Sequence, residues 1–385
     1  MADWYTVSAL AFIAILFAVF YRDRKNVKRE SVLLLRRTKR GKRLITAIGS
    51  RFPRFWKGVG LAAVAVGFFC SIYFLYAICD NLLKLFTGQI RLGAGLVIPS
   101  LTQEVSIGPG YFAIPFWYWI ISIALIFVVH EGMHGIMAVR EKIRIKSLGW
   151  GLLAVFLLAF VEPDEKQVAR KKPMQQLRFF AAGSFGNFLM AGLSALVIAL
   201  ITMTMFMQAG IDYSGLVSGY PASEANISGV ITGVNGHEIR NTTEFSAAMA
   251  DIGPGKLITL HTKTRNGTAY ESKSFTLMTV ERPDNASGGF IGISGVGNYL
   301  AIAAGLEPFT DAIYFASELF FFIFLLNLAI AMVNLLPLKP FDGGKMWELV
   351  FMKLSRRNYR YLVNGLGLFT LAVLAGNFVV PFLVW

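Results

Sequence analysis

Six long apolar segments constrain the fold of this chain more than any other feature of its sequence. Each is close to the twenty apolar residues that an α-helix needs to cross a bilayer. The chain has 385 residues and is 55% hydrophobic, which is too apolar for an ordinary soluble protein. The sequence therefore predicts a polytopic α-helical membrane protein with about six transmembrane helices. The predicted spans are residues 4–21, 59–79, 114–138, 178–206, 314–337 and 360–384.

Basic residues are concentrated between the first two predicted spans. Residues 22–57 hold fourteen Lys and Arg against Asp23 and Glu30. Basic segments beside a span stay on the cytoplasmic side and attract anionic lipid. Alternation from there places residues 207–313 outside the cytoplasm, and all four Asn-x-Ser/Thr sequons of the chain lie in that segment. The net charge of +14 therefore indicates a lipid bilayer as the partner and not nucleic acid.

The two cysteines, Cys70 and Cys79, fall within one predicted span. A helix separates them by about 13 Å, which is too far for a disulfide. A disulfide framework and a cysteine-based zinc site are therefore excluded, and we expect two buried apolar side chains.

Ionisable residues lie inside the third apolar span. His130, Glu131 and His134 read H-E-x-x-H. Such groups are costly at membrane depth, so their presence indicates a function. On a helix the two histidines project from one face, where both can bind one Zn²⁺ ion, and Glu131 is placed to act as general base. The alternative is a chance match, which is rare in a chain with only four histidines.

A zinc ion held by two histidines still needs a third protein ligand. The other histidines, His237 and His261, fall in the predicted extracytoplasmic segment. Residues 334–344 read N-L-L-P-L-K-P-F-D-G-G and follow a span that runs in the same direction as the third one. They supply Asp342 at the same membrane face. We expect the prolines and glycines of this stretch to break the helix and line a hydrated pocket; an ordinary loop between spans is the alternative.

Residues 210–298 have the pattern of a small β-rich domain. The Asn235-Gly236 pair predicts a tight hairpin turn. A short helix is predicted over residues 243–250, with Thr243 at its start. Apolar residues alternate over residues 229–239, which contain the hairpin turn, and residues 256–263 and 272–280 are predicted strands.

Two motifs together resemble the site-2 protease family of intramembrane zinc metalloproteases. H-E-x-x-H-G is followed about two hundred residues later by N-x-x-P-x-x-P-x-D-G-G, and the resemblance covers residues 59–385. It implies that His130, His134 and Asp342 bind zinc and that Glu131 is the catalytic acid/base.

Two further stretches resemble parts of the same family. Gly183–Asn187 is similar to the G-P-x-A-N element of the family, which implies that Asn187 lies near the scissile carbonyl; hydrogen bonding between helices is the alternative role for this residue. Phe160–Glu165 resembles the segment after a re-entrant β element in archaeal members. That element would be a hairpin around Lys146–Val155 that pairs with an unwound substrate; a buried helical piece is the alternative.

The inserted domain resembles circularly permuted PDZ domains. Gly219–Ala225 is similar to their G-x-P-A-x-x-A element, and Ile231–Gly236 to the strand and turn that follow. Between them, Asn226–Gly229 is shorter than the usual stretch. The resemblance implies a PDZ-like α+β domain that binds a peptide ligand by strand addition; a spacer or size filter without a ligand is the alternative.

The sequence thus predicts an intramembrane zinc metalloprotease that hydrolyses peptide bonds in transmembrane segments, in regulated intramembrane proteolysis. Its substrates would be single-span membrane proteins, and its active site would face the cytoplasmic side of the cell membrane. One alternative is a zinc-binding scaffold or receptor without protease activity. The other is a transporter, but neither motif has the second copy that transporters often show.

The expected organisation has four parts. They are an N-terminal anchor span with the basic cytoplasmic loop (1–58), a first membrane-core part with H-E-x-x-H (59–206), an extracytoplasmic PDZ-like domain (207–300), and a second membrane-core part with the Asp342 motif (301–385).

Overall fold

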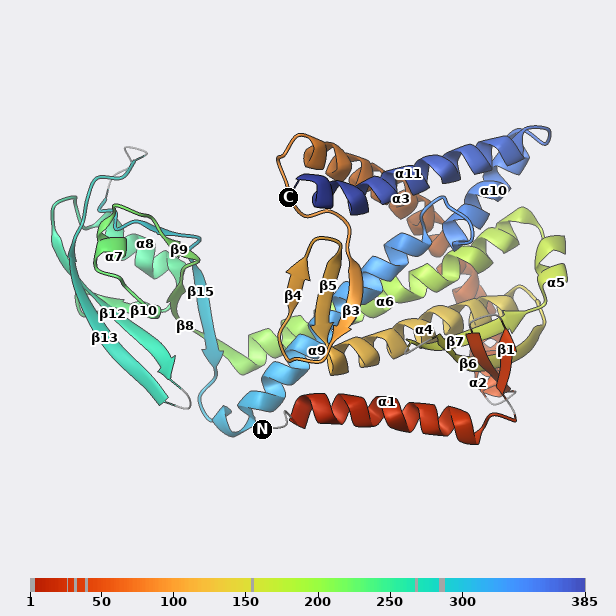
Figure 1. The fold of residues 1–385 in the computed structure, drawn as a ribbon, viewed down its shortest axis with the longest axis horizontal. Helices are drawn as coiled ribbons and strands as arrows, with labels where there is room; N and C mark the ends of the chain where they lie inside the picture. Colours follow the sequence, from red (N-terminus) through yellow and green to blue (C-terminus); the bar gives the residue numbers. More distant parts are fainter. Residues whose placement is uncertain are drawn as a thin grey trace. The chain divides into compact units, whose positions relative to one another are not determined.

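The computed structural model describes residues 4–25, 27–30, 33–38, 41–153, 156–266, 269–283 and 288–384 (Figure 1). The chain divides into two compact units. One comprises Met1–Ile198 and Ala316–Trp385, and the other comprises Ala199–Phe315.

Six helices of the described residues are long and apolar enough to cross a membrane, which confirms the predicted polytopic helical protein. Each matches one predicted span. They are α1 (Trp4–Arg22), α3 (Pro53–Phe86), α4 (Phe116–Arg140), α6 (Pro173–Met205), α9 (Thr310–Asn334, preceded by the 3₁₀ turn η1, Glu307–Phe309) and α11 (Tyr359–Val384).

Helix α3 extends well beyond the predicted span 59–79. It begins with Pro53, which suits the first turn because its missing N–H would be unsatisfied there anyway. Its C-terminal part continues past the apolar run and carries an ion pair between Asp80 and Lys84, one turn apart and 2.7 Å long. Hydropathy marks only the apolar part of a helix, so the polar ends were missed. Cys70 and Cys79 are free thiols on α3. Both are half-buried, whereas the sequence predicted that they are buried.

The basic segment between the first two spans is not a plain loop. Its described residues form a short helix and two strands, and the strands belong to a four-stranded antiparallel sheet in the order β1-β2-β6-β7. The helix, α2, packs on α4, where a Cβ at Gly49 would lie 2.8 Å from the Ile136 carbonyl oxygen. These elements are β1 (Val27–Glu30), β2 (Leu33–Thr38), α2 (Lys42–Arg51), β6 (Ile145–Leu153) and β7 (Phe156–Pro163).

The predicted hairpin after α4 is present as β6 and β7, and the helical alternative is wrong for its described residues. Its bounds differ from the expectation. Lys146–Leu153 forms only the first strand, residues 154–155 lie outside the described residues, and Phe160–Pro163 belongs to the second strand instead of following the hairpin. The second strand, β7, is at the edge of the sheet.

Four elements of the same unit lie where only connecting segments were expected. Three strands between α3 and α4 form a small sheet in the order β3-β5-β4. A short helix follows β7. The elements are β3 (Leu96–Ser100), β4 (Ser106–Gly108), β5 (Tyr111–Pro115) and α5 (Glu165–Arg170).

The Asp342 motif breaks the chain over a shorter stretch than expected. Helix α9 ends at Asn334, and a new helix, α10 (Asp342–Leu354), begins at the aspartate itself. Gly343 and Gly344 are therefore in its first turn, and the prediction that they break the helix is wrong. They are needed for close packing: a Cβ at Gly343 would lie 2.1 Å from the Leu335 carbonyl oxygen.

The unit Ala199–Phe315 is rich in β-structure, as predicted. Its main sheet has the order β13-β12-β10-β8-β15, with β11 paired to β10, and β9 pairs separately with β14. Ile211, Ile231 and Leu260 are fully buried in its core. Its elements are β8 (Phe206–Asp212), β9 (Gly215–Leu216), α7 (Pro221–Glu224), β10 (Val230–Val234), β11 (His237–Glu238), α8 (Thr242–Ala250), β12 (Leu257–Asn266), β13 (Ala269–Met278), β14 (Ile293–Ser294) and β15 (Gly297–Ile302).

The predicted hairpin turn and short helix of this unit are both present, but the residue that caps the helix differs from the prediction. Asn235 and Gly236 have φ of 51° and 82°, as a tight hairpin turn between β10 and β11 requires. Helix α8 is capped by Asn241, whose Oδ1 accepts a hydrogen bond of 2.9 Å from the Glu244 N–H. The prediction of Thr243 at the cap is wrong, because the helix already begins at Thr242 and Thr243 lies within its first turn.

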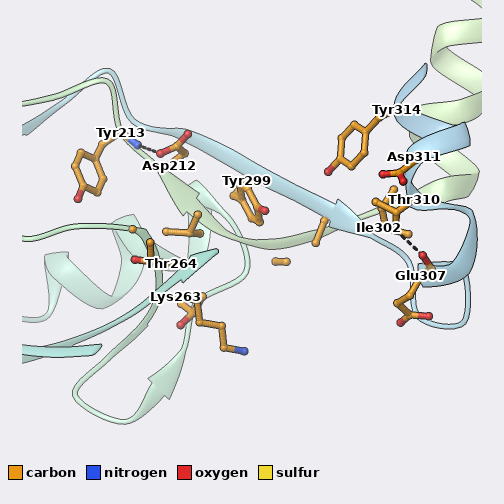
Figure 2. Close-up of a pocket in the computed structure, with 15 residues that line it drawn as sticks. Asp212, Tyr213, Lys263, Thr264, Tyr299, Ile302, Glu307, Thr310, Asp311 and Tyr314 are labelled. Carbon is orange, nitrogen blue, oxygen red and sulfur yellow. Dashed lines mark hydrogen bonds between the residues drawn. The ribbon is translucent and has the colours of Figure 1, made fainter. Parts of the chain in front are cut away.

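A cavity of about 850 Å³ also lies in this unit (Figure 2). Carboxylates and tyrosine rings share its lining, including Asp212, Asp311 and Tyr314. It contains none of the residues predicted for catalysis.

Candidate metal centre

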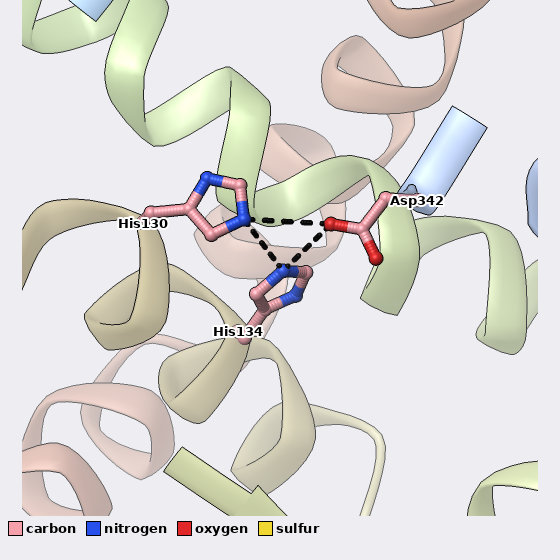
Figure 3. A group of neighbouring side chains, drawn as sticks. All are labelled: His130, His134 and Asp342. Atoms are coloured by element: carbon pink, nitrogen blue, oxygen red, sulfur yellow. Dashed lines mark hydrogen bonds and ion pairs between the residues drawn. The ribbon is translucent and has the colours of Figure 1, made fainter. Parts of the chain in front are cut away.

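Three side chains that are far apart in the sequence meet in the unit formed by the long helices (Figure 3). The His134 Nε2 atom lies 3.0 Å from Asp342 Oδ2 and 3.2 Å from His130 Nε2. His130 Nε2 lies 3.4 Å from the same Asp342 oxygen. All three residues are buried, each with 8% of its surface exposed. Their potential donor atoms therefore point at one small volume that is largely closed to bulk solvent.

Helix geometry and a tight loop bring these groups together. His130 and His134 stand one turn apart on α4 and so share a face. Asp342 reaches them because the chain between α9 and α10 folds back closely on itself. Ser71 on α3 donates a hydrogen bond of 2.6 Å to the Leu335 carbonyl oxygen and holds this loop in place.

An ion pair fixes α6 against the end of α4. Arg178 donates hydrogen bonds of 2.7 and 3.1 Å to the two carboxylate oxygens of Glu141, and Gln175 donates another of 2.8 Å. Glu141 is only 1% exposed and Arg178 is buried. A buried and fully hydrogen-bonded pair of this kind costs several kcal/mol when one partner is removed. It sets the register of α6 beside the two histidines.

Both histidine rings are oriented from α6. His134 Nδ1 lies 2.8 Å from the Phe179 carbonyl oxygen, and a carbonyl can only accept. Nδ1 therefore carries a proton, and Nε2 faces Asp342 and His130, where a neutral imidazole would offer its lone pair to a metal ion.

His130 Nδ1 lies 3.2 Å from the Asn187 side-chain amide nitrogen. Asn187 is fully buried, and its Oδ1 has no partner among the described residues. The two ends of an amide have the same shape, and turning Asn187 by half a turn lets Oδ1 accept from Nδ1–H. That arrangement frees Nε2 of His130 for a metal.

The donor set fits a zinc ion. Two imidazole nitrogens and one carboxylate oxygen are ligands that zinc prefers, and tetrahedral bonds of 2.0–2.1 Å separate neighbouring donors by about 3.3 Å. The observed separations are 3.0, 3.2 and 3.4 Å. Gly183 on α6 leaves the necessary space, since a Cβ there would lie 2.4 Å from His134 Nε2 and 2.5 Å from His130 Nε2.

The carboxylate of Asp342 is held in its charged form. Burial alone would raise its pKa, but His134 and His130 outweigh burial, and the pKa of Asp342 lies well below its ordinary value. The second oxygen, Oδ1, lies 3.5 Å from Lys345 Nζ. One oxygen thus faces the histidines while the other faces a cation.

A cavity of about 560 Å³ opens onto this centre. Glu131 lies on its wall with both histidines and Asp342, as a general base beside a metal would. Glu131 Oε2 accepts a hydrogen bond of 2.9 Å from the Val161 N–H of β7. Asn187 does not line the cavity and lies behind the His130 ring.

The structure therefore brings His130, Glu131, His134 and Asp342 together and places Asn187 behind the site. Several groups that shape the centre have no counterpart among the predicted residues. The Phe179 carbonyl and the Val161 N–H are backbone groups, which no residue type announces. Gly183 was part of a recognised motif without a role, and Lys345 was detectable as a cation one turn after a carboxylate ligand.

Known proteins match the chain over this same region. The sequence model of peptidase family M50 matches residues 118–374. An uncharacterized protein of Methanocaldococcus jannaschii is 25% identical over 360 residues, which cover 92% of this chain and 87% of that protein. The zinc metalloprotease RasP of Shouchella clausii is 23% identical over 233 residues, which cover 50% of this chain and 54% of RasP. Since the family match extends over more than half of the sequence and includes all of the centre, the chain belongs to peptidase family M50, the site-2 protease family.

Proposed function

We propose that this protein is a zinc-dependent endopeptidase that hydrolyses peptide bonds within transmembrane segments of single-span membrane proteins. The observation that carries the proposal is the buried group His130, His134 and Asp342, with Glu131 on the wall of the same cavity. A purely structural zinc site needs ligands but no base beside them. A centre of this kind inside a helical membrane unit suits substrates that are themselves in the bilayer.

The chemistry divides between the metal and the chain. A zinc ion held by these three residues would supply Lewis-acid polarisation of a carbonyl and would make a water molecule more acidic. Glu131 takes the proton from the attacking water and delivers it to the leaving amine. The ion pair of Asp342 with Lys345 and the hydrogen bond of His134 to Phe179 hold two of the ligands in place.

Asn187 has two possible roles in this reaction. The family resemblance assigns it to the developing charge on the scissile carbonyl oxygen. Its full burial, its position 3.2 Å from His130 Nδ1 and its absence from the cavity wall support a different one. We propose that Asn187 orients the His130 ring, as partners behind metal ligands commonly do.

A helical substrate must unwind before its carbonyls can be attacked, because they are engaged in hydrogen bonds within the helix. Strand β7 is at the edge of its sheet, next to the cavity that holds the centre. An edge strand offers backbone groups to which an unwound segment can pair. We propose that β6 and β7 form the re-entrant element that receives the substrate.

The remaining predictions concern orientation and the second unit. We propose that the metal centre faces the cytoplasmic half of the membrane and that Ala199–Phe315 contains an extracytoplasmic PDZ-like domain. The asymmetric distribution of basic residues supports the orientation. The succession of β10, a tight turn, β11, α8, β12 and β13 supports the domain assignment. A peptide ligand bound by strand addition is proposed with it.

Cleavage of a single-span reporter by purified, reconstituted protein tests the proposal. Glu131→Gln keeps all three ligands, so we expect it to bind zinc like the wild type and to lose at least about 100-fold in cleavage rate. Asp342→Asn should lose both zinc and cleavage. Full cleavage by Glu131→Gln would contradict the mechanism. If the wild type binds zinc but cleaves no reporter, the non-proteolytic scaffold becomes the better assignment.

A further inference from the structure

The carboxylate of the proposed catalytic base is in contact with the sheet. Glu131 Oε2 accepts a hydrogen bond of 2.9 Å from the Val161 N–H. Glu131 follows His130 on α4, and Val161 lies in the second half of β7. The backbone of β7 therefore contacts the base directly, beside the residues that face the metal.

The register of the hairpin explains why this N–H is available. Val161 is opposite Leu148, and Phe160 is opposite Gly149. In an antiparallel pair, backbone groups point alternately toward the partner strand and away from it. Since the Val161 N–H points away from β6 to reach Glu131, the N–H of Ala159, two residues earlier, points the same way. No strand pairs with β7 on that side within the described part of the chain.

We propose that the Val161 N–H is a positioning group for Glu131 and marks the end of the substrate-binding edge of β7. This inference rests on the function proposed above. A backbone N–H bound to a carboxylate is a strong and directional hydrogen bond. It fixes Oε2 and leaves Oε1 to receive the proton of the attacking water. A substrate strand cannot use the same N–H, so the last β7 N–H to which it can pair is that of Ala159.

A fixed length of β7 separates the backbone group that pairs with the substrate from the group that holds Glu131. Two residues of a strand span about 7 Å. The last β7 group that pairs with a substrate therefore lies one such step from the group that holds the base. The scissile bond is then placed beside Glu131 by the register of the paired strand, and no side-chain pocket is required for this placement.

The test removes the Val161 N–H without disturbing the hydrogen bonds between β6 and β7. Proline lacks the N–H, and a strand tolerates it at an edge position whose N–H points away from its neighbour. We expect Val161→Pro to lower kcat by about 100-fold, as loss of alignment of a catalytic group does, with KM and zinc content unchanged. Val161→Ala keeps the N–H, so its kcat should stay well above that of Val161→Pro. Ala159→Pro, on the same edge but away from Glu131, should raise KM and leave kcat unchanged.

A second measurement does not depend on the proline variant. Hydrogen exchange of the Val161 amide should be slow in the intact protein and should accelerate in Glu131→Ala, while amides of β6 keep their rates. A Val161 amide that exchanges equally fast in both proteins overturns the inference.

The two proposals fail in different ways. Wild-type kcat in Val161→Pro, or a raised KM with kcat unchanged, would overturn the positioning role while Glu131→Gln stays inactive. Cleavage by Glu131→Gln would instead remove the proposed function itself.

Discussion

Gly183 shows how much the metal centre depends on a single position without a side chain. It faces the two Nε2 atoms from α6, and a Cβ there would come within 2.5 Å of both. Real Cβ atoms do not approach other atoms so closely, so any side chain must displace a histidine or α6. Gly192 is on the same helix, and a Cβ there would point into open space.

We therefore expect Gly183→Ala to weaken zinc binding by at least about 10-fold and to abolish cleavage. Gly192→Ala is the matched control, because it gains the same helix propensity, about 1 kcal/mol, without a clash. Zinc affinity is measured by competition with a chelator, and folding by thermal unfolding. Wild-type zinc affinity in Gly183→Ala would show that α6 can move to admit the methyl group, and that zinc binding does not depend on the absence of a side chain at position 183.

At this scale the sequence predicted side chains far better than backbone groups. His130, Glu131 and His134 were predicted because their residue types are costly in a membrane and their spacing suits a metal. Asp342 was predicted because its motif reaches the same membrane face and the other histidines do not. The Phe179 carbonyl and the Val161 N–H could not be identified in this way. Their positions depend on how α6 and β7 lie beside α4, and this tertiary register leaves no mark on composition.

Among the elements, the hairpin β6–β7 is tied together by Glu162. Its carboxylate accepts hydrogen bonds of 2.6 Å from the Ser147 hydroxyl and 3.1 Å from Arg37 Nε. The hydrogen bond from Ser147 is the largest cause that lowers the pKa of Glu162, and Arg37 adds to it against the opposing effect of burial. One side chain thus connects β7 with both β6 and β2.

This pKa shift predicts a loss of hairpin stability in acid. A carboxyl group with a lowered pKa stabilises the fold above its ordinary pKa of about 4.3, and the contribution disappears as the pH falls through the lower value of the folded protein. We expect about 0.5 kcal/mol, because the group is about one-third exposed. Protease sensitivity of the hairpin between pH 7 and pH 3 measures it. Glu162→Gln should remove this component of the pH dependence, and an unchanged profile would assign it to other groups.

The elements also show where sequence patterns stop being informative. The six spans were predictable because the thickness of the bilayer sets a length of apolar chain. The strands β1 and β2 were not predicted, because a dense run of Lys and Arg indicates only on which side of the membrane the segment lies. The start of α10 was mistaken for irregular chain, since glycines that serve close packing resemble glycines that end a helix.

For the whole molecule, the charge pattern predicts a topology that labelling can test. In a background without Cys70 and Cys79, we expect a cysteine at position 240 to react with an impermeant thiol reagent from outside intact cells. Arg240 is exposed and its ion pair with Glu238 is on the surface, so the substitution should not disturb the fold. A cysteine in place of the exposed Arg51, on α2, is the control and should react only after lysis. The reverse pattern would invert the proposed orientation.

The long separation of the metal-facing residues has a consequence for how the protein is made. Asp342 follows His134 by 208 residues and comes after the fifth long helix. A ribosome that has already delivered the two histidines and Glu131 to the bilayer has yet to supply the residue that completes the group. Metal binding requires all of its ligands in one folded site, so in the proposed protease a nascent chain cannot cut its neighbours. Synthesis of α10 is then the step that turns an inert membrane protein into a hydrolase.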